Sequence, residues 1–304
     1  MKIRMRKPAA ARGGGGPGRD RREVLRVGPR AMPQGGFTLV ELLVVIAVVG
    51  ILAGMLLPAL TRIKEQGKAI QCLNNKKQLQ TAWALYPVDN EDKLVPHGLN
   101  VPSPPQPELN LWWAQGFLNY DGGNSENTNE ALLLDPKYAQ LGPYTETATI
   151  YKCPSDRSSV KVSRRGSAPR VRSISMNAYA GGQGQCGMAN RTVKFGPQSY
   201  STILNPSSMF VFIDEHPDSL DFVTFWVEDR KNGAGLISSF GSCPSSLHND
   251  AATISFADGH VELHKWLDPR TRPPVTYARR LSFQFYGSDN PDVRWLQERT
   301  QFEQ

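Results

Sequence analysis

The chain has 304 residues, of which 39% are hydrophobic and 21% are charged, and its formal net charge at pH 7 is +7. A mean hydropathy of −0.40 excludes a polytopic membrane protein, whose chain would be far more apolar. The 6 Trp, 9 Tyr and 12 Phe exclude a wholly disordered chain, because side chains of this kind can build a core.

The positive charge is concentrated at the N-terminus. Residues 1–36 hold ten basic and two acidic residues, which leaves 25 basic and 26 acidic residues in the other 268. Gly, Pro, Ala and Arg dominate this segment without apolar periodicity, so we expect a disordered leader. The rest of the chain is close to neutral. Its charge therefore gives no argument for nucleic-acid binding, and we expect no nucleic-acid partner.

An apolar run follows the leader and begins at Phe37. Residues 39–60 contain one charged residue, and as a helix they would extend about 33 Å, enough to cross a hydrocarbon core of about 30 Å. Basic residues before the run predict a single-pass helix in the inner membrane, with a cytoplasmic N-terminus and a periplasmic head. The alternative is an ordinary signal anchor or a cleaved secretory signal, although no small-x-small cleavage site follows the run.

The single charge in the run is Glu41. A carboxylate within an apolar span costs about 2.5–3.5 kcal/mol and usually has a partner. A cut after Gly36 would give Phe37 a new α-amino group, which is positive near neutral pH, and would make Glu41 the fifth residue. The carboxylate can then neutralise the amine of a neighbouring helix. Pro58 removes a hydrogen bond from the same helix and would bend it.

Residues 36–60 resemble the N-terminal signature of type IV prepilins and type II secretion pseudopilins. The matching positions are Gly36 before the cut, Phe37 as the first mature residue, Glu41 as the fifth and Pro58 as the twenty-second. The resemblance implies that a prepilin peptidase cleaves after Gly36 and N-methylates Phe37. It also implies assembly with other pilin or pseudopilin subunits through this helix, in the membrane or in a filament.

The leader is longer than is usual in such proteins. Met5 and Met32 are therefore alternative starts, although Met32 would leave a leader without basic charge.

The helix is predicted to continue to Tyr86 and to end at Pro87, with residues 61–86 as its amphipathic half. Its expected apolar stripe comprises Ile63, Ile70, Leu79, Trp83 and Tyr86, and Cys72 falls at helical spacing with the last three. Residues 87–130 are rich in Pro, Asn and Gly and predict a surface loop region. Within it we expect Trp112 and Trp113 to be buried, whereas exposed tryptophans would suggest recognition of a carbohydrate or a partner protein.

Residues 87–304 predict an exported head with short β-strands and a C-terminal tail. The expected fold class is therefore α+β and pilin-like, with the long helix packed on an antiparallel β-rich head. The Asp258-Gly259 pair predicts a hairpin with a type I′ turn. The expected strands are Thr149–Lys152, Arg172–Met176, Met209–Ile213, Phe222–Val227, Thr253–Ala257 and Val261–Trp266.

Segments of the head resemble the large prepilin-like proteins that have a processing-associated H-X9-DG region near the C-terminus. The motif is present as His248, nine intervening residues and Asp258-Gly259. The other matching segments are Cys72–Leu79, Tyr151–Asp156, Ser175–Tyr179 and Phe210–His216. The resemblance covers most of residues 37–272 and implies no biochemical mechanism.

We predict neither catalytic residues nor a cofactor, and we expect that the protein is not an enzyme. The sequence has no G-x-S-x-G elbow, P-loop or dinucleotide fingerprint, and a dyad of Cys153 with His216 or His248 would depend on the tertiary structure. No metal site is predicted, and the weak candidate ligands are His216, His248, Asp258 and His260. His260, Glu262 and His264 also alternate along one strand face.

The cysteines are Cys72, Cys153, Cys186 and Cys243. An exported head meets an oxidising compartment, so a disulfide between Cys153 and another of them is expected, and three full pairings are possible.

The expected function is that of a structural pilin-like or pseudopilin-like subunit in a type II secretion or type IV pilus-like assembly. The alternative is a membrane-anchored display or binding protein that recognises a glycan or a protein and uses the signal only for export.

Overall fold

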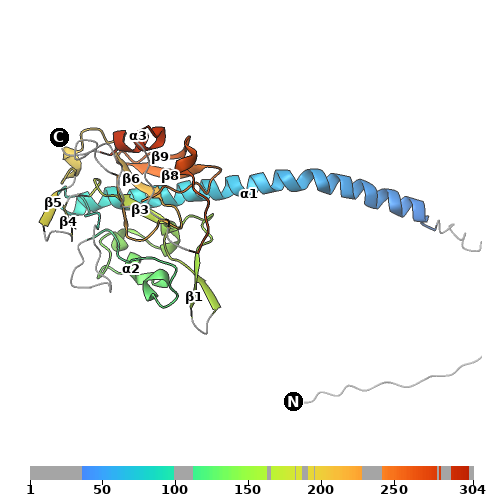
Figure 1. Cartoon of the computed structure of the whole chain (residues 1–304), viewed down its shortest axis with the longest axis horizontal. Coiled ribbons are helices and arrows are strands. Elements are labelled where there is room, and N and C mark those ends of the chain that lie inside the picture. Colours follow the sequence, from blue (N-terminus) through green and yellow to red (C-terminus); the bar gives the residue numbers. More distant parts are fainter. Residues whose placement is uncertain are drawn as a thin grey trace, which may run out of the picture. The chain divides into compact units, whose positions relative to one another are not determined.

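The computed structural model describes residues 36–98, 112–162, 166–181, 183–186, 191–194, 196–227, 242–278, 281 and 289–300. The chain divides into two compact units, of which the first ends at Gly54 and the second begins at Met55. Helix α1 (Leu39–Asp89) contributes to both units (Figure 1). The described part of the first unit is the N-terminal portion of α1 and the three residues before it.

The N-terminal portion of α1 exposes its apolar side chains. Every large apolar side chain from Phe37 to Leu57 is at least half exposed. By length and composition α1 can cross a membrane. Position 58 lies within α1, so the helix continues through the expected site of a bend.

The helix passes Pro87, so its predicted end at that residue was wrong. A proline lacks its own N–H donor, but the residues that follow it can remain helical. The end is set by the next turn, where Asn90 Nδ2 donates to the Tyr86 carbonyl at 2.8 Å. Glu91 and Asp92 then have positive φ values of 54° and 65°, which turn the chain away from the helix axis.

The predicted apolar stripe on the second half of α1 was correct only toward its C-terminal end. Leu79 and Trp83 are buried in the main core and Tyr86 packs against it, whereas Ile63 and Ile70 are 63% and 59% exposed. A second buried row consists of Cys72, Lys76 and Gln80, of which only Cys72 fell on the predicted helical spacing. These residues are four apart and share one helix face, so α1 also presents a polar row to the sheet.

The head contains a five-stranded sheet with the strand order β7-β3-β6-β8-β9. Strands β3 and β7 are parallel, and every other neighbouring pair in this sheet is antiparallel. The predicted α+β fold with an antiparallel-rich head is therefore confirmed. The strands are β3 (Ile174–Asn177), β6 (Phe210–Asp214), β7 (Thr224–Phe225), β8 (Ala251–Phe256) and β9 (Val261–Lys265).

Smaller elements complete the described head. Two separate two-stranded sheets pair β1 (Ser159–Val162) with β2 (Gly166–Pro169) and β4 (Gln183–Cys186) with β5 (Arg191–Lys194). The short helices are α2 (Ala131–Leu134) and α3 (Pro291–Glu298).

One predicted strand and one predicted turn were wrong. Residues 148–151 form a 3₁₀ helix, because the Thr147 side chain accepts a hydrogen bond from Thr149 N at 3.3 Å and caps its start. The hairpin of β8 and β9 is confirmed, but Asp258 lacks the positive φ that a type I′ turn requires. Instead Gly259 N donates to Phe256 O at 2.9 Å and Gly259 takes a φ of 92°, as in a three-residue hairpin loop.

Both faces of β8 are covered, which explains why all six of its residues are buried. Ile254 and Phe256 belong to a core that also contains Leu296 of α3. Ser255 lies on the opposite face and donates to Gln80 of α1 at 2.8 Å. Figure 1 shows this part of α1 running beside β3 and β6.

Trp112 and Trp113 are 4% and 0% exposed, so their expected burial is confirmed. Trp113 donates from its indole N–H to Val223 O at 3.2 Å. The Pro-rich residues 101–107 lie outside the described part of the chain.

Candidate functional site

The start of α1 is a capping box. The backbone N–H and the hydroxyl of Thr38 both donate to Glu41 Oε2 at 2.8 Å, and Glu41 N donates back to Thr38 Oγ1 at 3.2 Å. Thr38 directly precedes the helix, so it is the N-cap residue and Glu41 is the third helical residue. The Thr-x-x-Glu spacing is a capping signal in the sequence, and it predicts this role of Glu41 in addition to the role of its charge.

The bond expected to be cleaved lies immediately before this cap. Phe37 is 73% exposed, and a Cβ added at Gly36 would meet no atom within 4 Å. The chain itself therefore does not require glycine at position 36. Both bonds from Thr38 end on Oε2 of Glu41, so Oε1 takes no part in the cap.

A second cluster of chemically active side chains is buried in the head. Cys72, Cys153, Asp214 and His248 each place one sulfur, nitrogen or oxygen atom within 4.8 Å of the others, and all four are buried. Cys72 comes from α1, Cys153 follows the 3₁₀ helix of residues 148–151, and Asp214 ends β6. His248 precedes β8, in a turn where Asn249 has a positive φ of 57°. We refer to these four residues as the Cys–His cluster.

Short contacts connect the members of the Cys–His cluster. Cys72 Sγ donates to Asp214 Oδ2 at 3.2 Å, and Cys153 Sγ lies 3.1 Å from His248 Nε2. The other ring nitrogen of His248, Nδ1, is buried, and none of the described residues forms a hydrogen bond with it. Ser155 N donates to Cys153 Sγ at 3.4 Å.

Asp214 also forms a buried ion pair. Lys76 Nζ lies 2.9 Å from Asp214 Oδ1, and both side chains are fully buried. Thr253 donates to Asp214 Oδ2 from its backbone N–H at 3.0 Å and from its hydroxyl. Burial by itself would raise the pKa of Asp214, but Lys76 and Thr253 lower it below the ordinary value. The hydrogen bond with Cys153, burial and the Asp214 charge hold the pKa of the Cys72 thiol well above its ordinary value.

Two surface cavities reach the edges of the Cys–His cluster. A cavity of about 840 Å³ is lined by His248 together with Glu65 and Gln66 of α1. Another, of about 480 Å³, is lined by Cys153 and by Gln71 and Asn75 of α1. The buried cluster therefore lies between two surfaces that solvent reaches.

The remaining sequence candidates lie elsewhere. His216 Nε2 lies 3.1 Å from Pro273 O. Asp258 Oδ1 accepts from His260 N at 3.0 Å and lies 2.6 Å from His260 Nδ1, so these two residues close the hairpin loop. His264 stacks on Trp295 with ring centroids 3.7 Å apart. Of the two dyads considered from sequence, the tertiary structure brings together Cys153 and His248.

The H-X9-DG motif is thus divided between the two ends of β8. His248 belongs to the Cys–His cluster, whereas Gly259 O accepts a hydrogen bond from Lys77 Nζ of α1 at 2.5 Å. The first end of the motif therefore belongs to a cluster that includes Cys72 of α1, and the second end contacts α1 directly.

The cysteines that the structure describes do not form the expected disulfide. Cys72, Cys153 and Cys243 are buried free thiols. The side chain of Cys186 lies outside the described part of the chain.

A second buried polar network surrounds Glu215, the residue after Asp214. Its carboxylate accepts hydrogen bonds from Ser175 Oγ at 2.5 Å and from Ser219 Oγ at 2.8 Å. Burial and the nearby Asp221 raise the pKa of Glu215 to about 8. Arg172 is buried beside it, and burial lowers its pKa to about 10.

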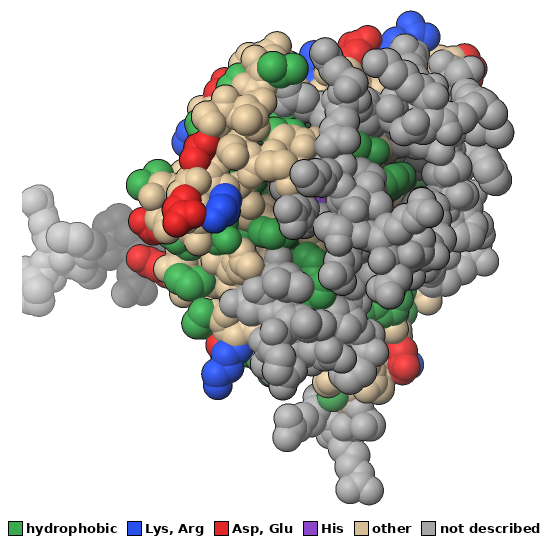
Figure 2. Space-filling view, turned by 90° about the vertical axis from the view of Figure 1, so that its left-hand side faces the viewer, with side chains coloured by type: hydrophobic (Ala, Val, Ile, Leu, Met, Phe, Trp, Pro, Cys, Tyr) green, Lys and Arg blue, Asp and Glu red, His purple; other side chains and the backbone are tan. Residues whose placement is uncertain are grey.

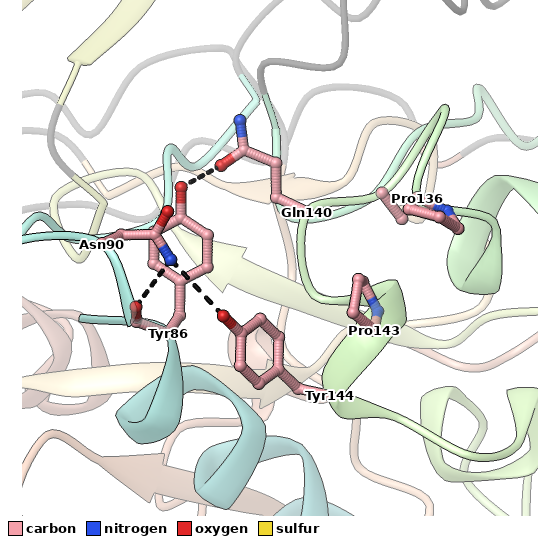
Figure 3. Close-up of a pocket in the computed structure, with 7 residues that line it drawn as sticks. Tyr86, Asn90, Pro136, Gln140, Pro143 and Tyr144 are labelled. Carbon is pink, nitrogen blue, oxygen red and sulfur yellow. Dashed lines mark hydrogen bonds between the residues drawn. The ribbon is translucent and has the colours of Figure 1, made fainter. Parts of the chain in front are cut away.

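Figure 3 shows a cavity of about 300 Å³ at the C-terminal end of α1. Tyr86 and Tyr144 meet there edge to face, with ring centroids 6.0 Å apart. Their hydroxyls are already hydrogen-bonded, because Tyr86 donates to Gln140 and Tyr144 donates to Asp89. Asn90 bridges the two tyrosines through its Nδ2. The polar groups of this cavity satisfy one another, so it ties the helix end to the loop of residues 136–144.

One face of the molecule is drawn in Figure 2. The described acidic and basic side chains on this face are interspersed with apolar ones and are not gathered by sign.

Comparison with known proteins gives one match. Residues 31–57 match the family model of the prokaryotic N-terminal methylation motif, a range that includes Gly36, Phe37 and the apolar part of α1 as far as Leu57. No curated protein and no solved structure gives a significant match.

Proposed function

We propose that this chain is a pilin-like or pseudopilin-like subunit of a type II secretion or type IV pilus-like machine. In this proposal a prepilin peptidase cuts the chain after Gly36 and methylates Phe37. The apolar portion of α1 then anchors the protein in the inner membrane, with the head in the periplasm. The observation that carries the proposal is the methylation-motif match over residues 31–57, joined to the large apolar side chains from Phe37 to Leu57, which are at least half exposed.

The exposed apolar surface and the glycine spacing of the apolar portion of α1 support assembly. Exposed apolar surface of this extent needs a membrane or neighbouring subunits to cover it. Gly50 and Gly54 are four residues apart, and a Cβ added at either would meet no atom within 4 Å. Glycines at this spacing allow another helix to approach closely.

The capping box gives Glu41 two roles that a substitution can separate. Within one chain Glu41 caps α1 through Thr38, and between chains its charge can neutralise the Phe37 amine of a neighbouring subunit. A glutamine retains an acceptor for the cap and lacks the charge.

The proposal is tested in cells that contain a prepilin peptidase, with cleavage followed by immunoblot and the mature N-terminus identified by mass spectrometry. Gly36→Glu is expected to abolish cleavage almost completely, whereas wild type yields an N-methylated Phe37. Gly67→Ala is the matched control, because an added Cβ at this α1 glycine also meets nothing within 4 Å. A mature-sized product from Gly36→Glu would disprove the assignment.

Glu41→Gln and Glu41→Val are both expected to be cleaved and to co-purify poorly with wild-type subunits. If Glu41→Gln assembles like wild type while Glu41→Val does not, the carboxylate acts as a cap and the proposed charge neutralisation is wrong.

We also propose that the head has a structural role and is not an enzyme. A binding or display protein is the alternative function. The observation that motivated this alternative was the Trp112–Trp113 pair, and both side chains are buried.

A further inference from the structure

We propose that Cys72, Cys153, Asp214 and His248 bind one Zn²⁺ ion, which links α1 to the sheet of the head. This inference rests on the second unit, which begins at Met55, and is independent of cleavage and assembly.

The ligand set is the first argument. Two sulfurs, one imidazole nitrogen and one carboxylate oxygen are ligand types that Zn²⁺ accepts in four-coordinate sites. They come from four segments that are far apart in the sequence, and the fold brings all four within 4.8 Å of one another. A disulfide would require only the two sulfurs and would leave the convergence of His248 and Asp214 unexplained.

The distances are the second argument. Zinc bonds of about 2.0–2.3 Å in a tetrahedron separate neighbouring ligand atoms by about 3.3–3.8 Å. The observed separations of 3.1 Å for Cys153 Sγ and His248 Nε2, and of 3.2 Å for Cys72 Sγ and Asp214 Oδ2, are close to this range. Small side-chain rotations therefore suffice to admit the ion.

The charge balance is the third argument. Zinc binding releases one proton from each thiol, so the site would hold two thiolates, the Asp214 carboxylate, the Lys76 ammonium and Zn²⁺. These charges sum to zero, which a buried site requires. Replacing two thiol protons with one divalent cation leaves the net charge of the site unchanged.

The surroundings of the ligands are the fourth argument. Lys76 and Thr253 hold the carboxylate of Asp214, and Ser155 N donates to the sulfur of Cys153. Groups that hydrogen-bond to ligands in this way fix the ligand orientation around a metal. The cavity beside His248 gives the ion a route from solvent. With four protein ligands and full burial, the site fits a structural zinc better than a catalytic one.

The test uses the full chain, purified in detergent with an affinity tag that contains no histidine. Elemental analysis is expected to find about one zinc per chain. Replacement by Co²⁺ is expected to give the intense near-ultraviolet thiolate-to-cobalt band. Cys72→Ser and His248→Ala should each reduce the zinc content by more than about tenfold. Cys243→Ser and His264→Ala, which change a buried thiol and a histidine outside the cluster, should leave it unchanged.

Because the variants can fail to fold, the wild-type protein is also treated with a chelator. Removal of zinc is expected to lower the unfolding temperature, and added Zn²⁺ should restore it. Three results would overturn the proposal: no bound zinc after reconstitution, equal loss of zinc in the two control variants, or a Cys72–Cys153 disulfide in the unreduced protein by peptide mapping.

Discussion

The two halves of α1 differ in what surrounds them. From Phe37 to Leu57 all large apolar side chains are exposed, and the one charged residue, Glu41, is held in the helix cap. From Cys72 to Trp83 the same helix buries an apolar row that contains Leu79 and Trp83, and a polar row that contains Cys72, Lys76 and Gln80.

This difference shows that hydrophobicity and burial are separate properties of a helix. The apolar half needs an apolar environment, which the described part of the chain does not provide. The polar row can be buried because the sheet satisfies it: Asp214 pairs with Lys76, and Ser255 donates to Gln80. Such groups are tolerated in a core only while their partners are present.

The largest effect is expected from Lys76→Met. The substitution leaves the Asp214 carboxylate buried without its cation, and breaking a buried ion pair in this way costs about 3–5 kcal/mol. Denaturant unfolding of the full chain in detergent measures the loss. Lys77→Met makes the same change one residue further along, where it removes an exposed bond to Gly259 O and should cost about 1 kcal/mol or less. Equal losses for the two variants would show that the polar row is not a buried, paired row.

Leu79→Ala and Ile70→Ala test the corrected apolar stripe. Leu79 is fully buried, so its truncation should cost about 2–5 kcal/mol by leaving a cavity. Ile70 is 59% exposed, and its truncation should change the free energy of unfolding by about 0.5 kcal/mol or less. The same unfolding assay compares them. A loss at Ile70 as large as the loss at Leu79 would restore the stripe expected from the sequence.

The most condition-dependent effect is expected from Glu215→Gln. The pKa of Glu215 is raised from 4.5 to about 8 in the folded protein. The folded state therefore holds a proton that the unfolded state has lost, so the contribution of Glu215 is complete below about pH 4.5 and is lost as the pH rises to about 8. As the pH rises from about 4.5 to about 8, the free energy of unfolding of wild type should therefore decrease relative to that of Glu215→Gln.

Unfolding at about pH 5, 7 and 8.5 measures this trend. Glu130→Gln, at an exposed position, provides the matched control and should show a constant difference from wild type. A constant difference for Glu215→Gln as well would mean that the carboxyl is charged throughout the range.

The elements that follow from local pattern were predicted well. The long helix, the β8–β9 hairpin and the burial of Trp112 and Trp113 are all observed. The errors arose where a local hydrogen bond or a tertiary contact decided the outcome. Thr147 caps a 3₁₀ helix where a strand was expected, and the parallel pairing of β3 with β7 joins segments that no local signal connects.

The head site illustrates the same limit. From the sequence, Cys153 and His248 were considered as a dyad and Cys72 and Cys153 as disulfide candidates, but the three were not joined in one site and Lys76 was assigned no role. Their convergence depends on the packing of α1 against β6 and β8, which brings together residues more than 100 positions apart. No spacing rule predicts such a set, because its ligands come from four separate segments.

The sequence by itself determined the processing signal and the apolar half of α1, because both depend on residues that are neighbours along one helix. Gly36, Phe37, Thr38 and Glu41 lie within a single turn or at its edge. Only the tertiary structure decided which face of the second half of α1 is buried and what the cysteines contact. A buried charge or thiol on α1 needs a hydrogen-bond or ion-pair partner, and groups such as Asp214 and Thr253 are distant from it in the sequence. Only the packed fold brings these partners close enough.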